Sequence, residues 1–569
     1  MSPSPRHPAR THAPALRAAL RALALAAGLA AGAGACAAPP AAHGGADAAL
    51  AKTVAGRLHG DRTGACLAVA TIDGDRIARA YVCADGGDAS RRIGPESAFE
   101  IGSISKTMLG ALLAELIREG KASLDDPLAD YLPDGATVPQ FEGEPIRLRH
   151  IVTHTSGLPA IPQGVSYDPQ NPYAGLDADT LLQALAKTTL IRAPGAQFEY
   201  SNFAAMLLSH AVARRSGEDF EALMRTRLFA PLDMDHSYID HRPESVRAVQ
   251  GHLPNTQPTP AWTFGKNLAG VGGVRATLDD MVRYVPGQMG AAHDPLLASL
   301  RLSQQPVETA SGAPMAIHWM RAELRGHTWI THEGGTGGFS AFTAFDPQTR
   351  RGAVVLSDTA LHSLGGLQGL GLHLLDPKMP LPKPRKVAKP SPGLIDALVG
   401  EYDLGGAMKM QVRRRGDALE IQAAGQEAFV MGYDDAGDFH PLAFDALLTP
   451  KPRADGRMGF IWTQGGGQMT ATRIDRDATQ SPQPTAAQLA GYAGDYPLAP
   501  GFVLNIRAEG ATLMAQATGQ GAIALVPAGK DVFEFPAADI VIRFERDDAG
   551  NVHALVLEQH GRTTRAQRQ

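Results

Sequence analysis

The stretch FEIGSISKTMLGALLAELI, from Phe99 to Ile117, opens with small and polar residues and continues as an apolar, helix-like segment. Ser103 and Lys106 lie three residues apart in it, so on a helix they share one face. A serine hydroxyl becomes a good nucleophile when a neighbour takes its proton, and a lysine can do so when burial lowers its pKa. The first backbone N–H groups of the helix could stabilise a developing oxyanion. The alternative is a helix start with an incidental surface lysine.

Two further segments carry residues that could complete such a site. In PGAQFEYSNFAAMLL, Tyr200 and Asn202 lie in a turn that opens another helix. A phenol can relay a proton, and an amide can bind a substrate carbonyl or orient the lysine. In WITHEGGTGGFSAFTAFDPQ, strand-like flanks surround His332 and a glycine-dense stretch whose backbone can approach a ligand closely. Each segment alone also has a structural interpretation, as a helix cap beside a buried tyrosine or as a histidine at a strand end.

Taken together and in this order, the three segments resemble the serine β-lactamase and penicillin-binding-protein family. The resemblance is to its branch of class C β-lactamases, D-alanyl-D-alanine carboxypeptidases, D-aminopeptidases and esterases. It rests on SISK, on YSN, on HEG in place of Lys-Thr-Gly or His-Gly-Gly, and on the phrases LDDPLADYLP, IVTHTSGLP, PGAQFEYSN and GTGGF. The resemblance covers residues 45–376 and implies an α/β (α+β) domain, an antiparallel sheet flanked by helices with a helical subdomain.

The same resemblance implies a role for each motif residue. Ser103 would be the acylated nucleophile, Lys106 its proton acceptor and Tyr200 the general base or proton relay. The oxyanion hole would consist of the backbone N–H groups of Ser103 and Gly335. The residues expected to contact substrate are Asn202, His332, Gly334 and Gly335. His154, in IVTHTSGLP, is interpreted as part of a structural loop, and no metal or cofactor is expected.

The third motif departs from Lys-Thr-Gly in a way that bears on the substrate. His332 and Glu333 stand where those enzymes have a cation and a hydroxyl that help to hold a substrate carboxylate. A histidine is mostly neutral at pH 7, and Glu333 would repel a carboxylate if it pointed into the site. If Glu333 points away, it is a solvated strand residue. We therefore expect a serine hydrolase that forms an acyl-enzyme on amides or esters, either a peptidase for D-amino-acid peptides or an esterase. The alternatives are a class C-like β-lactamase and an inactive cell-wall-binding protein.

The C-terminal part contains two copies of one pattern. GEYDL from Gly400 recurs as GDYPL from Gly494, an offset of 94 residues. Five further pairs share this offset, namely Gly416 and Gly510, Leu419 and Leu513, Gly425 and Gly519, Phe439 and Phe533, and Gly456 and Gly550. Short alternating strands with glycine turns predict two small antiparallel β-barrel modules, with an accessory or packing role. A β-lactamase-like domain followed by two such modules is similar to the layout of bacterial D-aminopeptidases.

These patterns divide the chain into six parts. They are a signal peptide at 1–38, the hydrolase domain at 45–376, a Pro/Lys-rich linker at 377–392, the first module at 393–476, a second linker at 477–486, and the second module at 487–569. In the first part, arginines precede an alanine-rich apolar run that is too short to be a convincing membrane span. Cys36 follows Ala-Gly-Ala, as in a lipoprotein signal; cleavage after Ala35 or Ala38 without lipidation is the alternative. We expect an exported protein, either periplasmic or an outer-membrane lipoprotein.

The remaining cysteines fit export. Cys66 and Cys83 lie in two strand-like runs around a DGD turn, and a two-residue loop at Gly74 and Asp75 would place them directly opposite each other. An oxidising compartment would make the pair a cross-strand disulfide, and two unrelated thiols are the alternative. The net charge of -5, without a basic block, gives no reason to expect nucleic acid as a partner. The expected partner is a small peptide, ester or β-lactam substrate.

Overall fold

The computed structural model describes residues 44–569, except for 87, 406–407, 454–455, 465–466, 475–483, 500, 536–539, 548 and 560–561. The expected signal peptide, Cys36 and most of the second linker therefore lie outside the described residues. Within the described ranges, no helix is both long enough and apolar enough to cross a membrane.

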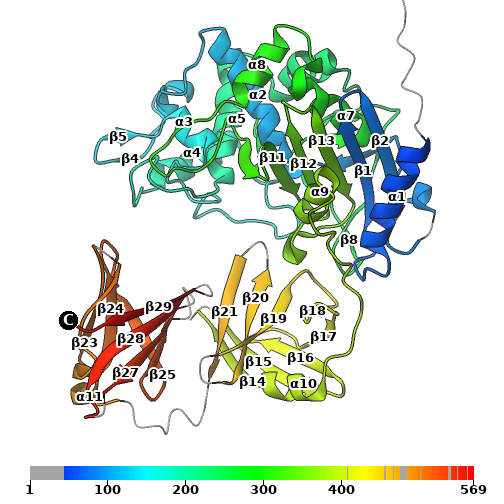
Figure 1. Ribbon diagram of the computed structural model, residues 1–569. Coiled ribbons are helices and arrows are strands. Elements are labelled where there is room, and N and C mark those ends of the chain that lie inside the picture. The colour runs from blue at the N-terminus through cyan, green and yellow to red at the C-terminus, as the bar shows by residue number, and fades with distance from the viewer. Residues whose placement is uncertain are drawn as a thin grey trace, which may run out of the picture. The chain divides into compact units, whose positions relative to one another are not determined.

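A six-stranded antiparallel sheet forms the centre of the N-terminal part, in the order β10-β11-β12-β13-β1-β2. Its strands are β1 (Cys66–Asp73), β2 (Arg76–Cys83), β10 (Met320–Leu324), β11 (His327–Gly335), β12 (Ser340–Asp346) and β13 (Arg351–Ser357). Strand β1 pairs with β13 from Leu67 opposite Ser357 to Asp73 opposite Arg351. The first two strands of the chain therefore complete a sheet whose other strands come much later, and Figure 1 shows the blue and green strands side by side.

Helices cover both faces of this sheet. On one face, α1 (Gly44–Leu58) and α9 (Gln368–Leu375) bury leucines and valines against β1, β12 and β13. The other face carries a larger core. Its helices are α2 (Ser105–Arg118), α3 (Leu148–Val152), α4 (Ala178–Lys187), α5 (Asn202–Ser216), α6 (Phe220–Leu223), α7 (Leu278–Pro286) and α8 (Leu296–Ser303). Short strands lie around them, namely β3 (Ser97–Glu100), β4 (Gln140–Phe141), β5 (Glu144–Pro145), β6 (Arg247–Ala248), β7 (Gly251–His252), β8 (Pro258–Thr259) and β9 (Arg275–Thr277).

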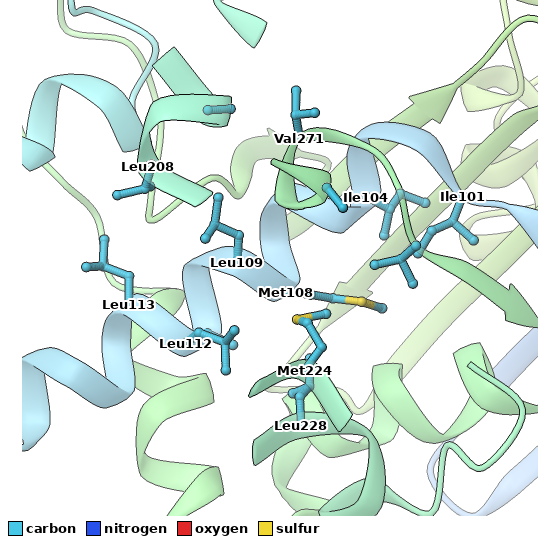
Figure 2. Close-up of a cluster of buried hydrophobic side chains, with 14 of the residues drawn as sticks. Ile101, Ile104, Met108, Leu109, Leu112, Leu113, Leu208, Met224, Leu228 and Val271 are labelled. Carbon is cyan, nitrogen blue, oxygen red and sulfur yellow. The ribbon is translucent and has the colours of Figure 1, made fainter. Parts of the chain in front are cut away.

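Helix α2 lies inside the larger core. Figure 2 shows Met108, Leu109 and Leu112 of this helix among side chains from other segments, including Leu208 and Met224. Burial of such side chains removes apolar surface from water and stabilises each by about 1.5–3 kcal/mol. The apolar run after Lys106 therefore forms a buried helix, as its pattern predicts, and the residues at the start of that helix are buried too.

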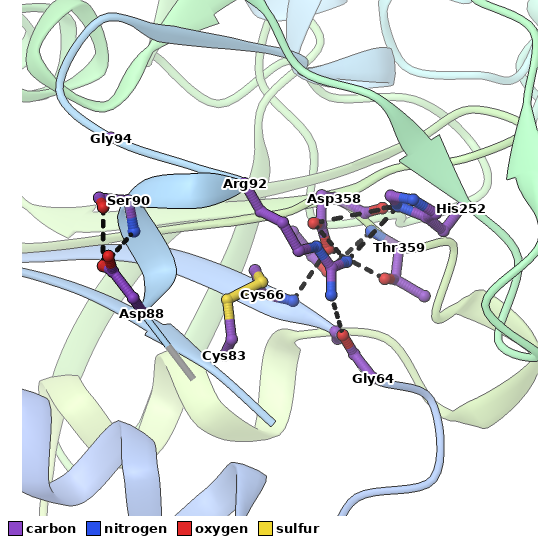
Figure 3. The surroundings of a disulfide bond; sticks show 12 residues. Gly64, Cys66, Cys83, Asp88, Ser90, Arg92, Gly94, His252, Asp358 and Thr359 are labelled. Atoms are coloured by element: carbon purple, nitrogen blue, oxygen red, sulfur yellow. Dashed lines mark hydrogen bonds and ion pairs between the residues drawn. A yellow bond between two sulfur atoms is a disulfide. The ribbon is translucent and has the colours of Figure 1, made fainter. Parts of the chain in front are cut away.

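A disulfide between Cys66 and Cys83 joins β1 to β2. The hairpin pairs Asp73 with Arg76 and Cys66 with Cys83, which is the register obtained by counting outward from the DGD turn. Next to the disulfide, the buried carboxylate of Asp358 accepts hydrogen bonds from the Cys66 N–H at 2.8 Å and from Arg92 at 2.6 Å (Figure 3). This end of the hairpin is thus also joined to the residue that follows β13.

Two eight-stranded antiparallel β units form the C-terminal part. The first is a closed barrel made of β14 (Gly400–Leu404), β15 (Met408–Arg415), β16 (Ala418–Ala423), β17 (Phe429–Tyr433), β18 (Phe439–Pro441), β19 (Leu447–Pro452), β20 (Met458–Gln464) and β21 (Gly467–Ile474). The second consists of β22 (Gly494–Ala499), β23 (Phe502–Glu509), β24 (Thr512–Ala517), β25 (Ile523–Gly529), β26 (Val532–Phe535), β27 (Ile540–Arg546), β28 (Val552–Gln559) and β29 (Arg562–Gln567). It is nearly closed, since the N–H of Gln569 donates to the carbonyl oxygen of Asp495 at 2.9 Å.

The 94-residue repeat is visible in these two units. Strands β15 and β16 start and end 94 residues before β23 and β24. A short helix precedes each unit, α10 (Pro392–Leu398) and α11 (Ala486–Ala490). The Tyr402 hydroxyl donates to the carbonyl oxygen of Leu398 at 2.9 Å, and the Tyr496 hydroxyl donates to that of Tyr492 at 2.9 Å. Each unit therefore contains a buried tyrosine whose hydroxyl bonds to the carbonyl oxygen four residues earlier. The prediction of two antiparallel barrels is confirmed.

Candidate active site

Ser103 and Lys106 meet at the start of α2. Ser103 lies in the 3-10 turn Gly102–Ile104, and Lys106 lies in the first turn of the helix. The Lys106 Nζ is 2.8 Å from Ser103 Oγ and donates to the carbonyl oxygen of Val271 at 2.7 Å. Both neighbours are uncharged and the lysine is fully buried, so desolvation lowers its pKa well below the ordinary value. A neutral amine beside a serine hydroxyl can accept its proton.

Tyr200 approaches the same serine from another segment. Its hydroxyl shares a hydrogen bond with the Ser103 side chain, and its ring centroid is 5.0 Å from Lys106 Nζ. Burial raises the pKa of this phenol, so it stays protonated at neutral pH. The local fold places it just before α5, whose N-cap Ser201 accepts a hydrogen bond from the Ala204 N–H at 3.0 Å. Serine, lysine and phenol thus form one connected group.

Asn202 is the first residue of α5, and Tyr173 holds its amide. The Asn202 Nδ2 donates to the Tyr173 hydroxyl at 2.9 Å. The Oδ1 atom is buried and has no hydrogen-bond partner among the described residues. Burial raises the pKa of Tyr173 to about 12, so this hydroxyl is neutral. In this arrangement Asn202 offers an acceptor oxygen to a ligand, while Tyr173 fixes the side-chain plane.

His332 lies on β11, close to the lysine. Its Nδ1–H donates to the carbonyl oxygen of Glu333 at 2.6 Å, which leaves Nε2 unprotonated; this buried atom has no partner in the described part of the chain. Burial, and then the neighbouring Lys106, lower the pKa of His332 to about 3. The ring at the position of the family's third-motif lysine is therefore neutral across the physiological range.

Glu333 lies on the opposite face of the sheet from His332. Side chains alternate along a strand, and Glu333 pairs with Phe342, which belongs to the core that α9 covers. A methyl group placed on Gly366, just before α9, would lie 3.1 Å from Glu333 Oε2. Burial raises the pKa of this carboxyl group. Glu333 therefore does not face Ser103, which settles the question that the sequence left open.

The backbones of the two motifs approach each other so closely that only glycine fits. A methyl group on Gly334 would lie 1.9 Å from the Ile101 carbonyl oxygen and 3.1 Å from the Ser103 N atom. One on Gly102, where φ is +51°, would lie 2.3 Å from the Gly335 N atom. The N–H groups of Ser103 and Gly335 are therefore neighbours. Strand β10 pairs with β11 only as far as Thr331, so among the described strands none pairs with His332–Gly335 on that side.

Four contributors to this site were not singled out by the sequence. They are the Val271 carbonyl, Tyr173, His318 and His362. A methyl group on Gly335 would lie 1.4 Å from His362 Nε2, so this imidazole lies against the expected oxyanion hole. None of the four belongs to a local motif. In the described residues, no group of three or more His, Cys, Asp or Glu side chains is arranged to hold a metal ion.

Burial of His332 predicts a pH dependence of stability. The folded protein keeps this ring neutral down to about pH 3, whereas the unfolded chain protonates it near 6.5. The unfolded state binds more protons in that window, so the unfolding free energy falls as the pH drops, by up to about 1.4 kcal/mol per pH unit. Between pH 6.5 and about 4.5, the unfolding free energy of a His332→Gln variant should fall by roughly 2 kcal/mol less than that of the wild type. Urea unfolding at the two pH values measures this difference. The exposed His59→Gln control should behave as the wild type does, and equal losses in all three proteins would contradict this prediction.

Known proteins match the part of the chain that carries this geometry. The sequence profile of the family described as "Beta-lactamase" matches residues 48–363. This chain belongs to the beta-lactamase family. As a member of this family it is a serine hydrolase, with Ser103 and Lys106 at its S-x-x-K motif. The domain fold expected from the sequence is thereby confirmed.

Relatives within the beta-lactamase family have several named activities. The D-alanyl-D-alanine-carboxypeptidase/endopeptidase AmpH of Escherichia coli K12 is 30% identical over 310 residues, covering 51% of this chain and 78% of that protein. A beta-lactamase of Escherichia coli K12 is 27% identical over 307 residues, covering 46% of this chain and 76% of that protein. The structure of the D-alanine carboxypeptidase AmpC from Burkholderia cenocepacia is 23% identical, covering 55% of this chain and 92% of that chain with a TM-score of 0.44.

Proposed function

We propose that this hydrolase forms an acyl-enzyme on Ser103 and cleaves amide or ester bonds, as a peptidase for peptides that contain D-amino acids or as an esterase. The observation that carries the proposal is the buried Lys106 amine, 2.8 Å from Ser103 Oγ and without a charged hydrogen-bond neighbour. Such an amine is a base rather than a structural cation. The peptidase alternative is also supported by the name of the AmpH relative, a carboxypeptidase and endopeptidase.

The geometry supports separate proton-transfer roles for Lys106 and Tyr200 in acylation. Lys106 accepts the Ser103 proton as Oγ attacks the carbonyl carbon, and the N–H groups of Ser103 and Gly335 stabilise the oxyanion. Tyr200, whose raised pKa keeps it protonated, donates its proton to the leaving nitrogen or oxygen and regains one from Lys106. A water molecule then attacks the acyl-enzyme, the same groups move protons in reverse, and Ser103 is released.

The surroundings of the third motif support substrates without a carboxylate at that position. His332 is neutral and Glu333 faces the other side of the sheet, so these two residues supply neither the cation of Lys-Thr-Gly enzymes nor a repelling anion. An ester or an internal peptide bond needs no such cation. A β-lactam carries a carboxylate. β-Lactamase activity is the second candidate, because the Escherichia coli K12 relative with 27% identity is named a beta-lactamase.

One substrate panel tests the proposal. Purified protein is assayed with a p-nitrophenyl acyl ester, a D-alanine anilide, a D-alanyl-D-alanine peptide and a chromogenic cephalosporin. We expect turnover of the ester or of a D-peptide bond, with negligible cephalosporin hydrolysis. Ser103→Ala should lower kcat by about 10⁴-fold or more. Activity that survives this substitution would show that another residue is the nucleophile, and cephalosporin as the preferred substrate would favour the second candidate.

We also propose that residues 1–38 direct export. The Cys66–Cys83 disulfide supports this, because such bonds persist in oxidising compartments. Expression of the full chain in a Gram-negative host, followed by intact-mass analysis of the protein and of a Cys36→Ala variant, distinguishes the two processing routes. A lipid-sized mass increase that is lost in Cys36→Ala would show lipidation, whereas masses that fit cleavage after Ala35 or Ala38 with no lipid-sized increase in either protein would show simple cleavage. An uncleaved chain would contradict both.

A further inference from the structure

His154 contacts three consecutive residues around Tyr200. Its carbonyl oxygen accepts a hydrogen bond from the Glu199 N–H at 2.7 Å, and its ring Nδ1 accepts one from the Ser201 N–H at 3.2 Å. Between these two bonds, the imidazole stacks on the Tyr200 ring with centroids 4.1 Å apart and an interplanar angle of 25°. His154 therefore holds the backbone on both sides of Tyr200, and its ring stacks on the phenol ring.

The hydrogen bond to Ser201 also fixes the state of the imidazole. Because Nδ1 accepts an N–H, it carries no proton, so the ring is the neutral Nε2–H tautomer. The ring is fully buried, and the neighbouring groups that can carry positive charge are His318, Lys106 and His332. All of them, together with burial, lower the pKa of His154. A protonated His154 would lose its bond to Ser201, so the neutral ring is the one that holds the tyrosine.

A second buried histidine, His318, lies next to His154. His318 is fully buried and its ring centroid is 5.4 Å from that of His154, while its backbone N–H donates to the Val152 carbonyl oxygen at 3.0 Å. The His154 ring is thus close to both the Tyr200 ring and the His318 ring. Both residues have positive φ angles, +55° for His154 and +59° for His318. Such angles are uncommon for residues other than glycine, so their backbones are held by their surroundings.

We propose that His154 is a positioning residue for acylation, which holds the Tyr200 hydroxyl in hydrogen-bond reach of Ser103. The inference rests on the proposed function, in which Tyr200 transfers the proton. The Tyr200 ring has His154 on one face, and the Lys106 amine is 5.0 Å from its centroid. When the imidazole is removed, the phenol can tilt away from the serine. A displacement of about 1 Å at a proton-transfer group can lower a rate by 10²-fold.

Two substitutions separate the two contacts of the ring. His154→Asn keeps an acceptor oxygen near the Nδ1 position and tolerates the positive φ, but it removes the stacked ring. His154→Phe keeps a ring and removes the acceptor. We expect each to lower kcat for the p-nitrophenyl ester by about 10- to 100-fold with KM changed by less than about threefold. The matched control is His210→Ala, a partly buried histidine on α5 that lines a surface pocket with Arg214 and Asn267.

A double-mutant cycle with Tyr200→Phe distinguishes positioning from a general structural effect. If His154 acts through the tyrosine hydroxyl, His154→Asn should cause no further loss in the Tyr200→Phe background. A full additional loss in that background, or a kcat within twofold of the wild type in both single variants, would overturn the inference. Circular dichroism and thermal unfolding confirm that the assayed variants are folded.

A crystal structure of His154→Asn separates failure of this inference from failure of the proposed function. We expect the Tyr200 hydroxyl to lie outside hydrogen-bond distance of Ser103 Oγ in that structure. An unmoved tyrosine would overturn the inference even if the enzyme is active. Absence of any Ser103-dependent hydrolysis in the wild type would instead reject the proposed function, and the structure would still decide whether His154 positions Tyr200.

Discussion

A Lys106→Met variant is expected to acylate Ser103 about 10³-fold more slowly than the wild type while keeping its fold. Methionine is unbranched and apolar and has similar length, so it can occupy the buried slot of the lysine. It has no basic nitrogen, and loss of a general base lowers rates by about 10²- to 10⁴-fold. The measurement is the rate of fluorophosphonate labelling of Ser103, followed by intact mass.

Lys106→Arg is the informative control for this variant. A guanidinium group stays protonated in proteins, so it cannot take the serine proton. The neighbours of the amine are the Ser103 hydroxyl and the Val271 carbonyl, so the arginine would be a buried charge without a counterion among them. We expect it to be as inactive as Lys106→Met and also less stable by several kcal/mol. An active arginine variant, or labelling of Lys106→Met at more than a tenth of the wild-type rate, would show that Lys106 is not the base.

A Gly334→Ala substitution is expected to lower kcat by about 10²- to 10³-fold, the range found when one oxyanion-hole donor is lost. The added methyl group would lie 1.9 Å from the Ile101 carbonyl oxygen, so β11 must move away from the nucleophile turn. That movement also separates the N–H groups of Ser103 and Gly335. Steady-state kinetics and thermal unfolding should both report the change, with a lower Tm accompanying the lower kcat.

Gly56→Ala provides the matched control for this prediction. Gly56 lies in α1, where the nearest atom to an added methyl group would be 4.0 Å away. Alanine favours a helix over glycine by about 1 kcal/mol, so this variant should be fully active and slightly more stable. If Gly334→Ala retained wild-type kcat, the close approach of the two backbones would have no role in oxyanion stabilisation.

The features that were accessible from the sequence are those encoded over short distances. Ser103 and Lys106 are three residues apart on one helix, so their contact follows from helix geometry alone. The disulfide register follows from the turn at Gly74 and Asp75. The two barrels follow from the constant offset of 94 residues, which the strand bounds reproduce.

The features that the sequence did not reveal depend on contacts between distant segments. The Val271 carbonyl that binds Lys106 is 165 residues away, and a backbone oxygen leaves no trace in the residue type. Tyr173 and His362 stand in no motif that marks them. For His154 the sequence predicts only a structural loop. Only the fold brings its ring against Tyr200, 46 positions later.

The pairing of β1 with β13 has a consequence for how the protein is made. Residues 66–73 can pair with β13 only when residues 351–357 have been synthesised, so the sheet cannot be completed during the early part of translation. Contacts between such distant segments fold slowly, because a long loop must close before they are formed. Until then β1 and β2 form only a hairpin, which is marginally stable in isolation. The later strands of the sheet must therefore be present before this N-terminal hairpin is stably held.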